Sequence, residues 1–129
     1  MNPIIPFVAF LGLTVACLGA AVVAGLLGRR SLHIPLVVGT VILLGITVWR
    51  ALVMGDSYDL EGTGDIYRFH LLTARATVAA LLLPAATGLL TIRSSSRKKT
   101  HRWLAFAALA LTIVTAATGT TLMLLAEPV

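Results

Sequence analysis

The sequence PIIPFVAFLGLTVACLGAAVVAGLLG, residues 3–28, contains no charged side chain. Arg29 and Arg30 follow it, and then comes a second apolar stretch, HIPLVVGTVILLGITVWRALVM, at residues 33–54. A run of about 18 or more apolar residues indicates a transmembrane helix, because at about 1.5 Å per residue it crosses a hydrocarbon core about 30 Å thick. The same criterion selects residues 69–92 and 103–126. We therefore predict four membrane spans.

The composition supports this class of protein. Of the 129 residues, 58% are hydrophobic and 12% are charged, whereas soluble domains carry about 25% charged residues. Too few polar side chains remain to cover a surface that faces water, which excludes an ordinary soluble fold. The connections at residues 29–32, 55–68 and 93–102 are short and favour antiparallel neighbours. The predicted fold is a single all-α domain, an up-down bundle of four transmembrane helices.

The charged residues are sorted between the connections. The middle connection carries four acidic residues, and Glu127 follows the fourth span. The first and third connections are basic and contain Arg29, Arg30, Arg93, Arg97, Lys98, Lys99 and Arg102. Because basic residues of short loops stay in the cytoplasm, we predict that residues 29–32 and 93–102 are cytoplasmic. Residues 55–68 and both termini then lie outside. The net charge of +5 reflects this sorting and does not indicate a nucleic-acid partner.

Three histidines lie in or at the edges of the spans, where ionisable residues are costly and suggest function. His33 and His101 are at the start of the second and fourth spans, and His70 lies in the third. At about 100° per residue, each falls on a stripe of small or hydroxylated residues, which suits a contact between helices. The second and fourth spans run in the same direction, so His33 and His101 are predicted to face each other across the bundle. His70 is predicted to lie at the opposite side of the membrane.

Two interpretations of the histidines remain open. Neutral imidazole binds metals and haem iron, so His33 and His101 can hold one b-type haem, with the basic residues of both cytoplasmic connections near its propionates. As metal ligands, the candidates are His33, His70 and His101. Alternatively, the histidines are structural, hydrogen-bonded within the bundle, and His101 belongs to the basic cytoplasmic patch.

Evidence for catalysis is absent from the sequence. No acidic residue lies inside a span, and there is no glycine-rich phosphate loop or nucleophile elbow. The prediction therefore leans away from an enzyme and names no catalytic residue. A transporter usually contains repeats with helices broken near the midplane. The second and fourth spans share an opening histidine, but one shared residue does not establish a repeat.

Arginines in the spans suggest a second hypothesis. Arg68 and Arg75 lie on one face of the third span, and Arg75 either extends to the outer head groups or faces a partner subunit. Arg50, near the outer end of the second span, either extends outward or pairs with acidic residues there. The alternative function is therefore a non-catalytic accessory subunit of a larger membrane complex, contacted along Arg68 and Arg75.

Three motifs also resemble a known family. His33-Ile-Pro-Leu follows the Arg29-Arg30 pair, IYRFHLLTA occupies residues 66–74, and HRWLA at residues 101–105 precedes Thr118-Gly119. Together they resemble the small four-helix membrane proteins that include the CtaM-type cytochrome oxidase maturation factors. The resemblance covers about residues 28–125 and implies a bacterial membrane protein of the respiratory chain that assists haem–copper oxidase assembly. It also implies that His33, His70 and His101 are candidate haem or metal ligands.

Overall fold

The computed structural model describes residues 4–129, except for the side chains of Arg93 and Ser95. Pro3, where the predicted first span begins, lies outside the described residues. The long helices are α1 (Ile4–Leu26), α2 (Arg30–Gly55), α3 (Asp65–Arg93) and α4 (Lys98–Leu125). Each is long and apolar enough to cross a membrane. This confirms the prediction of four long apolar helices.

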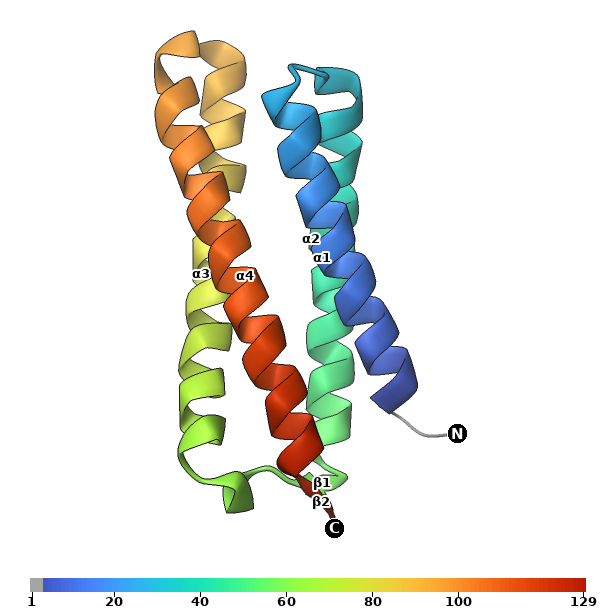
Figure 1. Cartoon of the computed structure of the whole chain (residues 1–129). Coiled ribbons are helices and arrows are strands. Elements are labelled where there is room, and N and C mark those ends of the chain that lie inside the picture. The colour runs from blue at the N-terminus through green and yellow to red at the C-terminus, as the bar shows by residue number, and fades with distance from the viewer. Residues whose placement is uncertain (1–3) are drawn as a thin grey trace.

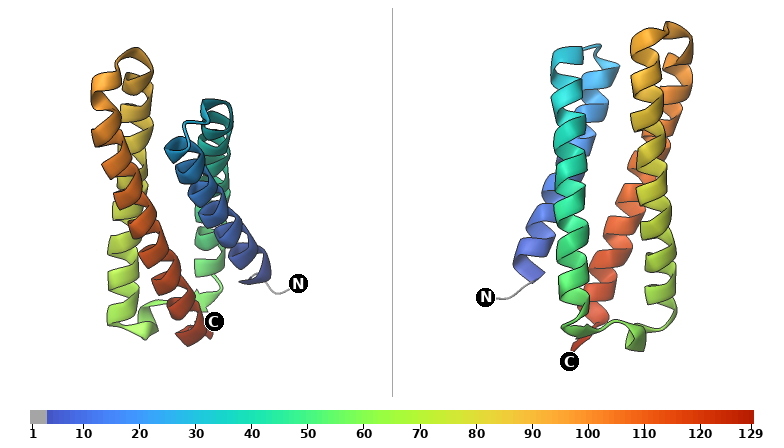
Figure 2. Two further views of the ribbon diagram at one scale, coloured as in Figure 1. Left: turned by 45° about the horizontal axis from the view of Figure 1, so that its top comes forward. Right: turned by 180° about the vertical axis from the view of Figure 1, so that it is seen from behind.

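The helices form two antiparallel hairpins, α1–α2 and α3–α4, which stand side by side (Figure 1). The main contact between the hairpins is made by α1 and α4, and the view from behind shows α2 and α3 standing apart (Figure 2). Gly28, in the turn between α1 and α2, has a φ of +69°. Glycine adopts this left-handed conformation without steric cost, which allows a tight turn.

The two ends of the molecule differ in charge. The α1–α2 and α3–α4 connections lie at one end, and the start of α1, the C-terminus and the middle connection lie at the other (Figure 1). We call the first the basic end, with Arg29, Arg30, Arg97, Lys98, Lys99 and Arg102, and the second the acidic end, with Asp56, Asp59, Glu61, Asp65 and Glu127. At the acidic end, β1 (Tyr58–Asp59) pairs antiparallel with β2 (Glu127–Pro128). This short pairing and the 3₁₀ turn η1 (Glu61–Thr63) connect the hairpins.

Three helices begin earlier than the predicted spans, and α2 begins at Arg30 instead of residue 33. α3 begins at Asp65 instead of residue 69, and α4 begins at Lys98 instead of residue 103, directly after the 3₁₀ turn η2 (Ser95–Arg97). Hydropathy locates the apolar part of a helix and misses its polar first turn, where an acid such as Asp65 interacts favourably with the positive end of the helix dipole. Because α4 begins at Lys98, His101 lies within the helix, ahead of the predicted span start at residue 103.

Small and hydroxylated residues fill the interior, and large apolar residues point outward. Ala21, Thr14, Thr77 and Ala108 are at most 3% exposed, whereas Leu52 and Leu72 are 68% and 67% exposed. Small residues allow helix backbones to approach closely in a membrane, where burial of large apolar groups gives no advantage over lipid contact. This distribution is compatible with contact between the outer surface and a lipid bilayer.

Candidate functional site

His33 of α2 and His101 of α4 meet at the basic end of the molecule. Their ring centres lie 6.1 Å apart, and the ring planes are nearly perpendicular, at 88°. Both residues are partly buried. One comes from each hairpin, so the pair lies between the two halves of the molecule. The structure therefore brings together the two residues that were predicted to face each other.

The His33 ring is oriented by α1. Its Nδ1 atom lies 2.7 Å from the carbonyl oxygen of Ala21. A carbonyl oxygen can only accept, so Nδ1 carries a proton and donates it. In the neutral imidazole, the other ring nitrogen, Nε2, then keeps its lone pair. The ring also lies against Gly25, where an added Cβ would be 3.0 Å from Nδ1.

The His101 ring is oriented by α3 in a similar way. Its Nδ1 atom lies 3.3 Å from the hydroxyl oxygen of Thr87, which itself donates to the carbonyl of Leu83 at 2.8 Å. With its own proton on the Leu83 carbonyl, the Thr87 oxygen accepts from Nδ1 of the His101 ring. A Cβ added at Gly88 would lie 3.2 Å from Cε1 of the ring. Thus His101 also has Nε2 free of the proton.

His70 of α3 lies apart from this pair. Its Nδ1 atom is 3.0 Å from the hydroxyl oxygen of Thr118, near the other end of α4, and its ring lies against Gly119. Across residues 4–129, as far as their side chains are described, no three His, Cys, Asp or Glu side chains are grouped to hold a metal ion. The three candidate histidines thus form one pair and one separate position.

The first helices of the two hairpins, α1 and α3, share a sequence pattern that was not among the predictions from the sequence. Residues 14–27 of α1 read TVACLGAAVVAGLL, and residues 77–90 of α3 read TVAALLLPAATGLL. Seven of these 14 positions are identical. The alignment pairs Gly25 with Gly88, the two glycines that contact the rings of the histidine pair. It also pairs Ala21, whose carbonyl oxygen accepts from the His33 ring, with Pro84.

The second helices of the hairpins share a pattern as well. Aligning His33 with His101 also aligns four further identical pairs, which are Arg29 with Arg97, Leu36 with Leu104, Leu43 with Leu111, and Thr47 with Thr115. The contacts repeat too, because the hydroxyl oxygens of Thr14 and Thr47 lie 2.9 Å apart and those of Thr77 and Thr115 lie 2.7 Å apart. The two hairpins are therefore repeats of one pattern of sequence and contacts.

The repeat does not extend to His70. In the same alignments Phe7 takes the place of His70, and Ala51 takes the place of Gly119. Phe7 is buried, so an apolar ring fills the corresponding position of the first hairpin. The duplicated part of the site is thus confined to the histidines of the basic end.

The arginines of the helices occupy different environments. Arg68 lies 4.0 Å from Asp65 on an exposed surface, and Arg75 is also exposed. The guanidinium carbon of Arg50 lies 5.2 Å from the ring centre of Trp49. Its Nε atom is buried and makes no hydrogen bond to any described residue. Arg68 and Arg75 are both distant along α3 from Thr87 and Gly88, the residues through which this helix contacts His101.

Comparisons of the chain with protein-family models, with curated proteins and with solved structures find no match. The function is therefore inferred from the histidine pair, the repeat and the charge distribution.

Proposed function

We propose that this chain is a membrane-spanning protein that binds one b-type haem between His33 and His101. The observation that carries the proposal is the 6.1 Å separation of the two ring centres. Two imidazoles that share one metal, each with a metal–nitrogen bond of about 2.0 Å, have ring centres about 6 Å apart. This separation fits two imidazoles that would together hold one iron.

The hydrogen bonds of the two rings support this role. A histidine that binds a metal commonly donates its other ring N–H to a carbonyl or similar acceptor, which fixes the tautomer and the ring orientation. Ala21 accepts this bond from His33, and Thr87 accepts it from His101. Both rings therefore have an unprotonated Nε2 and a held orientation before any ligand is bound.

The number of protein ligands favours haem over a bare metal ion. Zinc sites need three or four protein ligands, whereas a haem iron, bound by its porphyrin, would need only His33 and His101 from the protein. A haem held by both His33 and His101 would supply electron transfer. The basic end supplies cations for the two propionates.

The cellular setting is part of the same proposal. The family resemblance suggests a role in the respiratory chain of a bacterial inner membrane, in haem–copper oxidase assembly. In this role the protein would hold or pass on haem, and its side chains would perform no catalytic step. The basic end would face the cytoplasm, and the acidic end with both termini would face outward.

The proposal is tested by absorption spectroscopy of the protein purified in mild detergent, before and after dithionite reduction. We expect a Soret band that shifts on reduction, with sharpened α and β bands. His33→Ala and His101→Ala should each abolish the reduced spectrum, because each removes one axial ligand. His70→Ala is the matched control and should leave the spectrum unchanged.

Two results would contradict haem binding. One is a full spectrum in the His101→Ala protein with an intact helical fold by circular dichroism. The other is a wild-type protein that shows no Soret shift even when titrated with hemin, since this would show that the paired histidines are structural.

The exposed face of α3 favours a second candidate function, that of an accessory subunit. In the most apolar 18-residue stretch of α3, only 6% of the residues are buried within the chain. Arg75 is also exposed on this helix. A respiratory complex that packs along Arg68 and Arg75 would cover this face. Arg75→Ala should then release the protein from a co-purifying complex, and an unchanged complex size on a native gel would argue against this function.

A further inference from the structure

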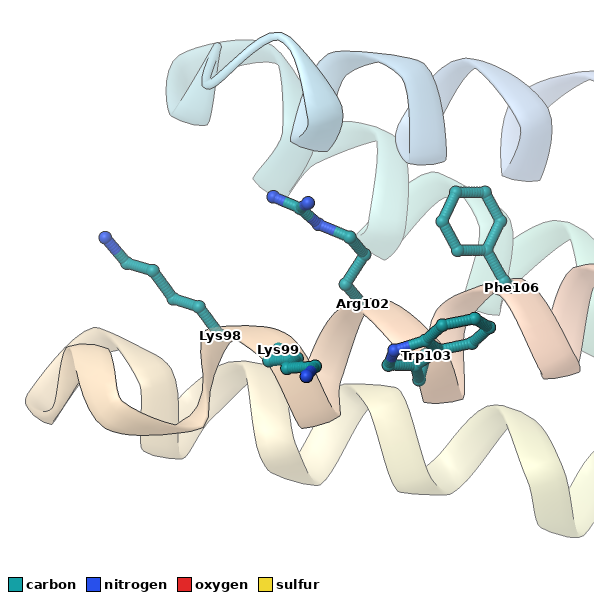
Figure 3. A pocket seen from close by; sticks show the side chains of 5 residues that line it. All are labelled: Lys98, Lys99, Arg102, Trp103 and Phe106. Carbon is teal, nitrogen blue, oxygen red and sulfur yellow. The ribbon is translucent and has the colours of Figure 1, made fainter.

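We propose that the start of α4 holds the phosphate head group of an anionic phospholipid. The site is a pocket of about 570 Å³ lined by Lys98, Lys99, Arg102, Trp103 and Phe106. Figure 3 shows the three cationic side chains near the helix start and the two aromatic rings further along it. The inference rests on the membrane insertion in the proposed function, but it does not depend on haem.

The order of residues along α4 matches the structure of a phospholipid. Lys98, Arg102 and Phe106 follow at intervals of four residues, and so do Lys99 and Trp103, so each set forms a stripe on one side of the helix. From Lys98 to Phe106 the helix rises about 12 Å, at about 1.5 Å per residue. The cations therefore lie at the level of the lipid phosphate when Trp103 lies at the inner edge of the head-group region and Phe106 reaches the acyl chains.

Charge complementarity identifies the occupant as anionic. All five acidic residues of the chain are at the acidic end. Within the part of the chain whose side chains are described, no carboxylate pairs with Lys98, Lys99 or Arg102. In addition, no side chain caps the start of α4, so its first backbone N–H groups add positive potential. Clusters of basic residues on the cytoplasmic side of membrane helices bind anionic lipid head groups in this way.

The aromatic residues indicate that the pocket binds a lipid rather than a free phosphate. Trp103 is 67% exposed and Phe106 is 39% exposed, directly below the cations. Tryptophan is enriched at the level of the lipid head groups, where its ring contacts chains and its N–H remains hydrated. A small soluble phosphate would use the cations and leave both rings without a contact.

The test uses the intrinsic fluorescence of Trp103 in the haem-free protein. The chain has two tryptophans, so Trp49→Phe leaves Trp103 as the single reporter. In lipid nanodiscs, phosphatidylglycerol with brominated acyl chains should quench Trp103 more strongly than brominated phosphatidylcholine at the same mole fraction. The reciprocal variant, Trp103→Phe, reports from Trp49 on α2 and should show no preference.

Charge variants test the contribution of the pocket. Lys98→Gln/Lys99→Gln/Arg102→Gln in the Trp49→Phe background should abolish the preference, because each basic residue near an anionic lipid contributes a factor of about five in affinity. Arg29→Gln/Arg30→Gln removes charge from the same end of the molecule and should keep the preference. An excess of inorganic phosphate should not displace phosphatidylglycerol.

The contrary outcomes are distinguishable. Equal quenching by both lipids, or a preference that survives the triple substitution, would refute the lipid site while leaving membrane insertion intact. Displacement by inorganic phosphate would assign the pocket to a soluble phosphate and would also refute it. Absence of quenching by either lipid would show that Trp103 is outside the bilayer, which would overturn the proposed membrane arrangement as well.

Discussion

At the residue scale, a glycine lies against each histidine ring and determines how deep the ring can lie. Gly25 contacts His33, Gly88 contacts His101 and Gly119 contacts His70, and each glycine comes from the other helix of the same hairpin. A side chain at any of these glycines would occupy space that the ring now uses. The glycines thus hold the rings close to the helix axes, where backbone carbonyls and threonine hydroxyls orient them.

Gly25→Ala should therefore weaken haem binding without unfolding the protein. The new Cβ would lie 3.0 Å from Nδ1 and 3.2 Å from Cε1 of His33, so the ring must move and its bond to Ala21 must lengthen. We expect about a tenfold lower haem affinity, equivalent to about 1.4 kcal/mol, measured by hemin titration of the Soret band.

A second glycine of α1 provides the control. Nothing lies within 4 Å of a Cβ added at Gly12, so Gly12→Ala should leave haem affinity unchanged. Equal affinities in the Gly25→Ala and wild-type proteins would show that the position of the His33 ring does not control binding.

At the element scale, the hairpin is the repeating unit of the molecule. Each hairpin contains a threonine pair near its middle and a histidine at its basic end. The interface between hairpins consists mainly of α1 with α4. Because lipid contact is as favourable as apolar contact inside a membrane, this interface has little hydrophobic driving force. A shared iron would therefore be a major link between the hairpins.

Dividing the chain after Gly62 tests this link. The fragments 1–62 and 63–129 each contain one complete hairpin. When the two fragments are expressed together in cells supplied with haem, they should co-purify. His33→Ala should reduce the recovery of the complex several-fold, because it removes the ligand that one hairpin contributes. Recovery is measured by affinity purification through a tag on one fragment.

The matched control for the divided protein is His70→Ala, which changes a histidine that bonds only within its own hairpin. It should not change recovery. Fragments that co-purify equally with and without His33 would show that helix packing alone joins the hairpins.

The helices illustrate what the sequence can and cannot predict. Four long apolar helices follow from hydropathy, and the 100° periodicity placed His33 and His101 on inward faces. The repeat is not evident from the matching positions of His33 and His101 alone. The connection in the second hairpin is longer, so no single alignment register pairs α1 with α3 and also α2 with α4. The starts of α2, α3 and α4 were missed because their first turns contain polar residues.

Side-chain detail was beyond the sequence for physical reasons. The hydrogen bond from His33 to Ala21 depends on where α1 lies against α2, and small residues allow many such positions. The pocket at Lys98 and Arg102 is lined by side chains of α4, and its shape depends on their rotamers. Periodicity gives the face of a helix, but it gives neither the partner nor the distance.

At the scale of the whole molecule, the charge distribution predicts one orientation in the membrane. A single cysteine, Cys17, is present, so Cys17→Ala gives a background for labelling. In intact cells a membrane-impermeant maleimide should label Glu61→Cys at the acidic end and should label Ser31→Cys and Ser96→Cys only after permeabilisation. All three positions are exposed.

The reverse pattern of labelling would show that the basic end faces outward and would contradict the predicted topology. Labelling of all three positions in intact cells would indicate a mixed orientation, which would also contradict it.

The repeat has a consequence for how reliably the histidine pair forms. A single hairpin with one such histidine would have to meet a second copy by diffusion in the membrane before the pair existed. Joining two copies in one chain makes the encounter intramolecular, with an effective concentration of the order of millimolar for a short linker. The pair then forms regardless of how few molecules the cell makes. Each copy can also change by itself, as the Phe7 and His70 positions already have.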